Sequence, residues 1–174
     1  MTGSMADAGQ AQAFYFAYGS NMAAERLASR VPAARKYVNA ELARYCLRFH
    51  KASADGSGKC DVVLSDSPDV VVYGVLFSLQ DADLGILDRI EGSGYRRVYV
   101  DVSTATGTIA GAATYVATKT QAGLRPYSWY KEHVLRGAIS NGLPAAWIAK
   151  LAAVVCDEDP DRTRHAREIA IYAG

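Results

Sequence analysis

Two short stretches carry groups whose types and spacing could do chemistry. The first is FYFAYGSNM, residues 14–22, where an apolar strand pattern runs into a helical pattern through Gly19, Ser20 and Asn21. The first N–H groups of a helix lack partners and carry the positive end of its dipole, so they suit a carboxylate or an oxyanion. Ser and Asn are also ordinary helix caps, and local chemistry alone favours that plainer interpretation.

The second stretch, DADLGILDRIEG at residues 81–92, ends in an acid on an apolar face. On a helix beginning near Asp81, the side chains of Leu84, Leu87 and Glu91 share one face, so the carboxylate stands where an apolar residue would extend the stripe. Burial and the negative end of the helix dipole would both raise the pKa of Glu91, as a general acid or base requires. A solvent-exposed Glu at a helix end is the more common situation and remains the alternative.

Tyrosines are the third candidate group. The chain has eleven of them against two tryptophans and four phenylalanines, a bias toward aromatic side chains with a polar tip that suits a wet pocket. Tyr95, Tyr115 and Tyr130 are the candidates, and ordinary packing in strands and helices is the alternative for each.

Other familiar sites are not indicated. The strand, glycine and helix near residue 19 lack the glycine patterns of dinucleotide and P-loop sites and the G-x-S-x-G of a nucleophile elbow. The acidic stretch DEDPD is better explained as a solvated helix cap than as a metal site. We therefore expect no metal and no cofactor, and we assign no catalytic role to the isolated histidines His50, His133 and His165.

The first half of the chain must position the Gly19 stretch. We expect a strand over residues 13–18 and a helix over 21–31 that Pro32 ends. Residues 36–50 and 61–64 read as strands joined by the loop KASADGSGK. A strand from Val70 to Leu79, apolar on both faces, precedes the helix that carries Glu91.

The second half continues with a hairpin and then with helices. YRRVYVDVS at residues 95–103 and the segment Thr108–Thr118 pair across a turn at Thr106 and Gly107. Residues 127–154 have helical periodicity with a break at Asn141 and Gly142, and a last helix begins with Asp159 as its cap and Pro160 at its first position. This order indicates an α+β fold with helices around the strands.

Composition bounds the remaining possibilities. The 174 residues are 50% hydrophobic, enough for one core, so we expect residues 13–174 to form a single domain. A net charge of +1 without a basic block does not indicate a nucleic-acid partner, and the three separate cysteines indicate free thiols in a reducing compartment. Residues 1–12 read as a disordered segment or an expression scar, and without a signal peptide or membrane span the protein is expected in the cytoplasm.

Three ordered segments together resemble a known family. YFAYGSNM at 15–22, LDRIEG at 87–92 and GAISNGLP at 137–144 resemble the γ-glutamylcyclotransferases, in particular the branch that acts on γ-glutamyl amino acids. The resemblance implies a small mixed β-barrel flanked by helices, with Glu91 as the catalytic acid and base. It implies that a small-molecule substrate is bound by Tyr18, Gly19, Ser20, Asn21, Met22, Tyr95, Tyr115 and Tyr130.

The implied reaction needs neither a protein nucleophile nor a metal, because the α-amino group of the substrate attacks its own γ-carbonyl and forms 5-oxoproline. Two alternatives stay open: release of an amine or a biosynthetic intermediate in place of an amino acid, and a ligand-binding protein without activity. Glutathione is a less favoured substrate, since the glutathione-specific branch departs from the YGSN pattern. A membrane partner is not expected, and a homodimer is compatible with the resemblance.

Overall fold

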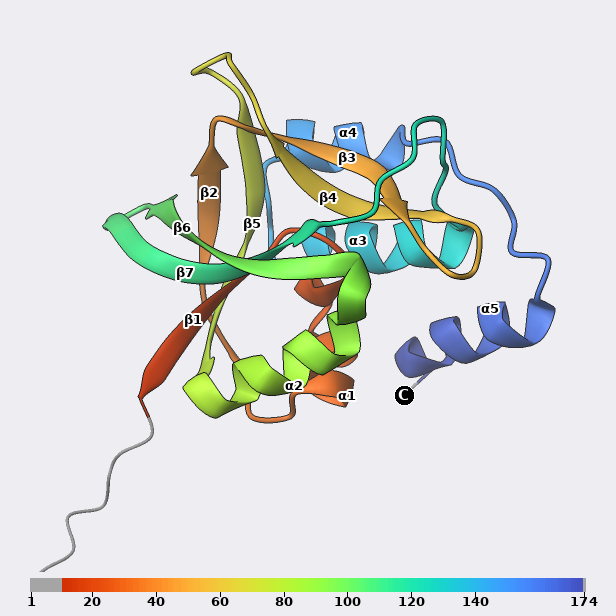
Figure 1. The fold of residues 1–174 in the computed structure, drawn as a ribbon, viewed down its shortest axis with the longest axis horizontal. Coiled ribbons are helices and arrows are strands. Elements are labelled where there is room, and N and C mark those ends of the chain that lie inside the picture. Colours follow the sequence, from red (N-terminus) through yellow and green to blue (C-terminus); the bar gives the residue numbers. More distant parts are fainter. Residues whose placement is uncertain (1–10, 174) are drawn as a thin grey trace, which may run out of the picture.

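The computed structural model describes residues 11–173, whose path is drawn in Figure 1. Most of the segment 1–12, expected to be a disordered tail or a scar, lies outside the described residues, although Gln12 already belongs to the first strand. The elements in chain order are β1 (Gln12–Ala17), α1 (Ala24–Arg30), β2 (Arg35–Ala43), β3 (Tyr45–Ala52), β4 (Gly58–Leu64), β5 (Val71–Gln80), α2 (Asp81–Glu91), β6 (Tyr95–Thr104), β7 (Gly107–Ala117), α3 (Ser128–Ser140), α4 (Ala145–Ala152) and α5 (Arg162–Ile169).

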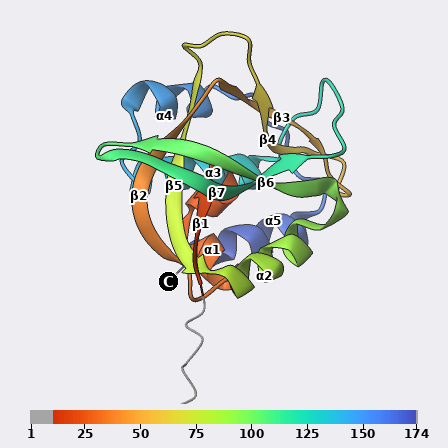
Figure 2. The ribbon, with the colours of Figure 1, turned by 60° about the vertical axis from the view of Figure 1, so that its left-hand side comes forward.

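Five strands close into a barrel in the order β1-β5-β2-β6-β7. Four of the neighbouring pairs are antiparallel, and the barrel closes through a parallel contact of β1 with β7 at Tyr15 and Ala113. Figure 2 shows β6 and β7 crossing β1, β2 and β5 at a steep angle. The expected mixed barrel with flanking helices is confirmed.

The segment expected as strand over residues 36–50 is divided. Arg44 lies between β2 and β3, and its φ of 65° is in the left-handed region, which interrupts the extended chain at this residue. The strands β3 and β4 then pair with each other in a separate two-stranded sheet, as expected for strands joined by the KASADGSGK loop. This hairpin lies outside the barrel and extends alongside α3 (Figure 1).

The apolar positions of the strands and helices meet in one core. Phe16, Leu76 and Leu87 are fully buried, which agrees with the expected helix face and central strand. Helix α3 packs directly on the turn that follows β1, because Gly137 has no side chain. A Cβ atom there would lie 2.6 Å from the backbone nitrogen of Ala23 and 2.6 Å from Cβ of Met22.

Two expected helix starts are wrong. The 3₁₀ turn Ser20–Met22 comes first, and α1 begins at Ala24 after Ala23, with no side-chain cap. Ser20 does not cap the helix because its hydroxyl instead accepts a hydrogen bond from Nε of Arg26 at 3.1 Å. Asn21 does not cap the helix either, and its Nδ2 donates to Tyr15 and Glu91 at the cavity described below.

The cap of α5 is Asp161, whose carboxylate accepts a hydrogen bond from the backbone N–H of Arg164 at 2.9 Å. Asp159, the expected cap, is buried and accepts a hydrogen bond from Nε1 of Trp129 at 2.7 Å. Pro160 therefore precedes the helix rather than starting it.

Among residues 11–173, we find no helix that combines the length and the apolar character needed to cross a membrane.

Candidate active site

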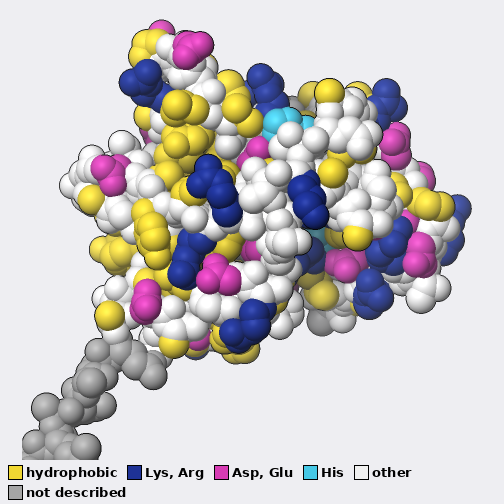
Figure 3. Space-filling view, viewed as in Figure 1, with side chains coloured by type: hydrophobic (Ala, Val, Ile, Leu, Met, Phe, Trp, Pro, Cys, Tyr) yellow, Lys and Arg dark blue, Asp and Glu magenta, His cyan; other side chains and the backbone are white. Residues whose placement is uncertain are grey.

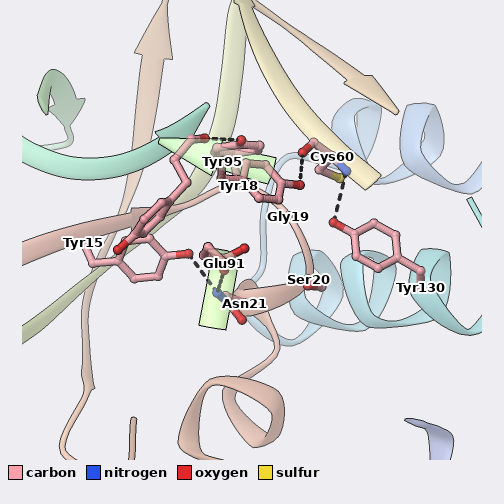
Figure 4. A pocket seen from close by; sticks show the side chains of 10 residues that line it. Tyr15, Tyr18, Gly19, Ser20, Asn21, Cys60, Glu91, Tyr95 and Tyr130 are labelled. Atoms are coloured by element: carbon pink, nitrogen blue, oxygen red, sulfur yellow. Dashed lines mark hydrogen bonds between the residues drawn. The ribbon is translucent and has the colours of Figure 1, made fainter. Parts of the chain in front are cut away.

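The turn after β1 and the end of α2 meet at one cavity, which we call the aromatic cavity. It encloses about 320 Å³ including its open mouth. Its wall comes from β1, the following turn, β4, the end of α2, β6, β7 and α3, so segments far apart in sequence converge (Figure 4). The lining residues are Tyr15, Tyr18, Gly19, Ser20, Asn21, Cys60, Glu91, Tyr95, Tyr115 and Tyr130.

Glu91 is the only acidic residue in this lining. Its side chain is 15% exposed, and its Oε1 accepts hydrogen bonds from Nδ2 of Asn21 at 3.2 Å and from Arg30 at 3.4 Å. Burial raises the pKa of Glu91, while the charges of Arg30 and Arg26 oppose that rise. The side chain is therefore not the exposed helix-end Glu that the sequence left as the alternative.

A glycine directly after Glu91 ends helix α2. Gly92 follows Glu91 with φ 64°, a conformation that disfavours other residues, and it ends α2. The carboxylate consequently stands at the last residue of the helix, facing the turn after β1.

The turn itself offers backbone donors. The N–H groups of Met22 and Ala23 donate to the carbonyls of Gly19 and Ser20, at 3.1 and 3.2 Å. The N–H groups of Ser20 and Asn21 donate to no acceptor within residues 11–173. Ser20 and Asn21 both line the cavity, and backbone N–H groups without a protein acceptor suit an oxyanion or a carboxylate.

Because Gly19 has no side chain, Cys60 and Tyr130 can pack close to its backbone. A Cβ atom at this position would lie 3.0 Å from Cβ of Cys60 and 3.4 Å from the hydroxyl of Tyr130. Met22, by contrast, is fully buried and is absent from the cavity wall; its side chain packs against Gly137 instead. Its contribution is structural support for the turn.

The three tyrosines selected from the sequence all line the cavity with Tyr18. The hydroxyl of Tyr95 donates to the carbonyl of Cys60 at 2.6 Å, and that of Tyr115 donates to Asp88 at 2.8 Å. Tyr18 donates to the carbonyl of Tyr115. Burial raises the pKa values of these phenols, so at neutral pH they are uncharged.

Tyr130 occupies the opposite wall, on α3. Its hydroxyl accepts a hydrogen bond from the backbone N–H of Cys60 at 3.1 Å (Figure 4). Burial raises the pKa of this phenol too, so it presents a neutral O–H to the cavity.

Three contributors were missed by sequence reasoning. Tyr15 accepts a hydrogen bond from Nδ2 of Asn21 at 3.0 Å, and its place on an apolar strand concealed a polar role. Arg30 reaches Glu91 from α1, and its spacing from Arg26 by four residues was an available signal that both arginines share a helix face. Cys60 had no local signal, because only the β3–β4 hairpin brings it to the site.

The arrangement suits proton transfer rather than covalent catalysis by the protein. Burial raises the pKa of the Cys60 thiol to about 12, so it is protonated at neutral pH and a poor nucleophile. Glu91 shares the cavity wall with Ser20, Asn21 and several neutral tyrosine side chains. Within the described residues, no three His, Cys, Asp or Glu side chains are grouped so that they could hold a metal ion.

The chain is similar in sequence to known proteins. The model of the AIG2-like family matches residues 71–151, from β5 to α4. A γ-glutamylcyclotransferase of Bos taurus is 35% identical over 147 residues, covering 80% of this chain and 77% of that protein. The human γ-glutamylcyclotransferase is 33% identical over 146 residues, with the same coverage of both chains.

Solved structures give the same result. One titled γ-glutamyl cyclotransferase superposes with a TM-score of 0.84 at 30% identity, covering 94% of this chain and all of that one. Sequence similarity along most of the chain and a shared fold together show that this protein belongs to the γ-glutamylcyclotransferase family.

Proposed function

We propose that the protein converts γ-glutamyl amides, first of all γ-glutamyl amino acids, into 5-oxoproline and the free amino acid or amine. The observation that carries the proposal is the buried carboxylate of Glu91, which lines one cavity with Ser20 and Asn21 and accepts a hydrogen bond from Nδ2 of Asn21. Its relatives named γ-glutamylcyclotransferase support the same reaction.

In the proposed reaction the substrate supplies its own nucleophile. The α-amino nitrogen forms a bond to the γ-carbonyl carbon, and the bond from that carbon to the leaving nitrogen breaks. The product is a five-membered lactam. The enzyme must fold the substrate so that amine and carbonyl meet, which in well-oriented intramolecular reactions lowers the barrier by up to about 7–11 kcal/mol.

Glu91 would move the proton in both halves of the reaction. Its carboxylate accepts a proton from the attacking nitrogen and then returns it to the leaving nitrogen, so no net proton is gained or lost. A pKa raised by burial suits this exchange, because the stronger base takes the proton from the attacking nitrogen more readily, and an acid whose pKa lies nearer the working pH can still return it to the leaving nitrogen.

The negative charge that develops on the carbonyl oxygen needs donors. Ser20, Asn21 and Tyr130 line the cavity, and the backbone N–H groups of the first two and the neutral phenol of the third would supply them. Donors that are already in place stabilise such a charge without reorganising during the step.

Two other functions remain as alternatives. The leaving group is an amine or a biosynthetic intermediate in the first, and the protein binds a γ-glutamyl ligand without turnover in the second. Glu91 is retained in the matching segment, which favours an enzyme over a binding protein.

The experiment is a panel of γ-glutamyl compounds in which 5-oxoproline release is measured for the wild-type protein and for Glu91→Gln. We expect kcat of the variant to fall by roughly a hundredfold to ten-thousandfold, since Gln cannot exchange a proton. Glu25→Gln is the matched control because it makes the same change at an exposed position of the neighbouring helix α1.

Retained activity in Glu91→Gln would overturn the assignment of the base. Calorimetric binding of 5-oxoproline with no turnover of any panel member would instead favour the non-catalytic alternative.

A further inference from the structure

A second cavity adjoins the aromatic one and differs from it in charge. It encloses about 480 Å³ including its open mouth, and Ser20, Glu91, Tyr95 and Tyr130 line both cavities. Its remaining wall contains four cationic side chains, so we call it the basic cavity; these are Arg26, Arg30, Lys51 and Lys59. On the face shown in Figure 3, basic and acidic side chains are interspersed, so such a grouping is not general on that surface.

Three of the four cationic side chains form ion pairs with carboxylates. Arg26 pairs with Glu168 at 2.7 Å, and Lys59 pairs with Asp55 at 2.8 Å. Arg30 contacts Glu91 itself at 3.4 Å.

Lys51 is the exception. Its ammonium group forms no hydrogen bond or ion pair with any residue in the range 11–173 that the structure describes. The Nζ atom lies 5.0 Å from the centre of the Tyr95 ring. Because the other three cations are paired, one positive charge at this wall is left for a ligand to neutralise.

The side chain of Lys51 is also held in position. A Cβ atom on Gly94 would lie 2.6 Å from Cε and 2.8 Å from Nζ of Lys51, so the lysine stem lies directly against that glycine. With the Tyr95 ring near its end, the half-buried ammonium is confined beside the boundary between the two cavities.

The proposed reaction determines what must lie there. Glu91 has to reach both the attacking and the leaving nitrogen. If the glutamyl group fills the aromatic cavity, the substituent on the leaving nitrogen extends past Glu91 into the basic cavity. The α-ammonium and α-carboxylate of the glutamyl group cancel each other, so any net charge of the substrate resides on the leaving group.

We propose that Lys51 is a specificity-determining residue that binds the carboxylate of the departing amino acid. This inference rests on the proposed function and deepens it. A leaving amino acid brings one negative charge to Lys51, whereas a leaving amine brings none. The protein therefore selects γ-glutamyl amino acids against γ-glutamyl amines of the same size.

The test uses two substrates of nearly equal size, γ-glutamylalanine and γ-glutamylalaninamide, which differ in the charge of one group. The wild-type protein, Lys51→Met and the control Lys36→Met are compared by kcat/KM for 5-oxoproline release. Lys36 is exposed on β2, so its replacement removes the same charge without touching either cavity.

We expect Lys51→Met to lower kcat/KM for γ-glutamylalanine by roughly tenfold to a hundredfold, the range for losing a hydrogen bond to a charged group. The loss should appear in KM, because the contact is equally present before and during the reaction. The alaninamide substrate and the Lys36→Met control should be unaffected. An unchanged preference, or an equal fall for both substrates, would overturn the inference.

A binding measurement separates this inference from the proposed function. Calorimetry of the same two compounds on Glu91→Gln, with and without Lys51→Met, reads the carboxylate contact without turnover. A Lys51-dependent preference in binding, with no 5-oxoproline formed by the wild type, would contradict the catalytic proposal alone. Binding of neither compound, or a preference independent of Lys51, would contradict the role of Lys51.

Discussion

The aromatic and basic cavities share a wall but are built on opposite principles. In the aromatic cavity, buried tyrosine hydroxyl groups donate to backbone and side-chain partners and stay neutral. Glu91 is therefore the ionisable side chain of this lining that can carry a charge near neutral pH. In the basic cavity, three cations form ion pairs, and Lys51 has no such partner among residues 11–173. The difference separates a region suited to moving protons from one suited to recognising a charge.

Asn21 links Glu91 to Tyr15 in the aromatic cavity. Its replacement is expected to have the largest effect among the variants that test this cavity. Its Nδ2 donates to Tyr15 and Glu91, and its Oδ1 accepts from Arg30 at 3.1 Å. We expect Asn21→Ala to lower kcat for 5-oxoproline release by roughly tenfold to a hundredfold, since the carboxylate loses its orienting donor.

Asn39→Ala is the matched control for that variant. Asn39 donates to the backbone carbonyl of Asn141 and lines neither cavity. An equal fall in kcat for both variants, at equal thermal stability, would show that Asn21 has no special relation to Glu91.

Arg30 connects Glu91 to the basic cavity, and its replacement should change the pH dependence. The charge of Arg30 lowers the pKa of Glu91 against the effect of burial, so Arg30→Met should raise that pKa further. The base works in its deprotonated form, so the acid limb of the kcat/KM profile should move to higher pH.

The pH profile is compared with that of Arg35→Met. Arg35 is exposed and donates to the carbonyls of Pro32 and Ala34, so this variant removes the same charge away from Glu91. An acid limb that stays in place in Arg30→Met, or that moves toward lower pH, would contradict the assigned electrostatics.

Cys60 tests whether the aromatic cavity contains a reactive nucleophile. Because burial raises the pKa of its thiol to about 12, we expect iodoacetamide at pH 7.5 to leave both Cys60 and the activity unchanged. Peptide mass analysis reads each site, with the less buried Cys46 and Cys156 as internal comparisons. Rapid alkylation of Cys60 with loss of turnover would argue for a covalent role.

The smallest expected effect is that of a chelator. The proposed reaction uses only protons and backbone donors, so dialysis against EDTA should leave 5-oxoproline release unchanged. A loss of activity that zinc or magnesium restores would contradict the metal-free mechanism.

The burial of Glu91 was one of two interpretations that the local pattern left open. Its spacing from Leu84 and Leu87 by helical repeats placed it on the buried face, and the structure has it there. The barrel could be anticipated from strand and helix order combined with the family resemblance. The closing contact of Tyr15 with Ala113 could not, since it joins residues nearly a hundred positions apart.

The errors have the same physical origin. Asp159 had the sequence context of a cap, but its carboxylate accepts a hydrogen bond from Trp129, which lies thirty residues earlier in the chain. Lys51 and Cys60 lie on a hairpin whose place outside the barrel follows from tertiary packing rather than from strand pattern. The family resemblance therefore proposed Glu91 as the base and the local pattern agreed with its burial, whereas the proposed role of Lys51 required the assembled fold.

The central claim is that the substrate's own amine attacks its γ-carbonyl beside Glu91. The most direct measurement is the product balance after complete conversion of γ-glutamylalanine by the wild-type protein, with 5-oxoproline, alanine and glutamate quantified together. Cyclisation predicts equal amounts of 5-oxoproline and alanine and no glutamate. Glutamate in place of 5-oxoproline would show that water is the nucleophile and would contradict the account.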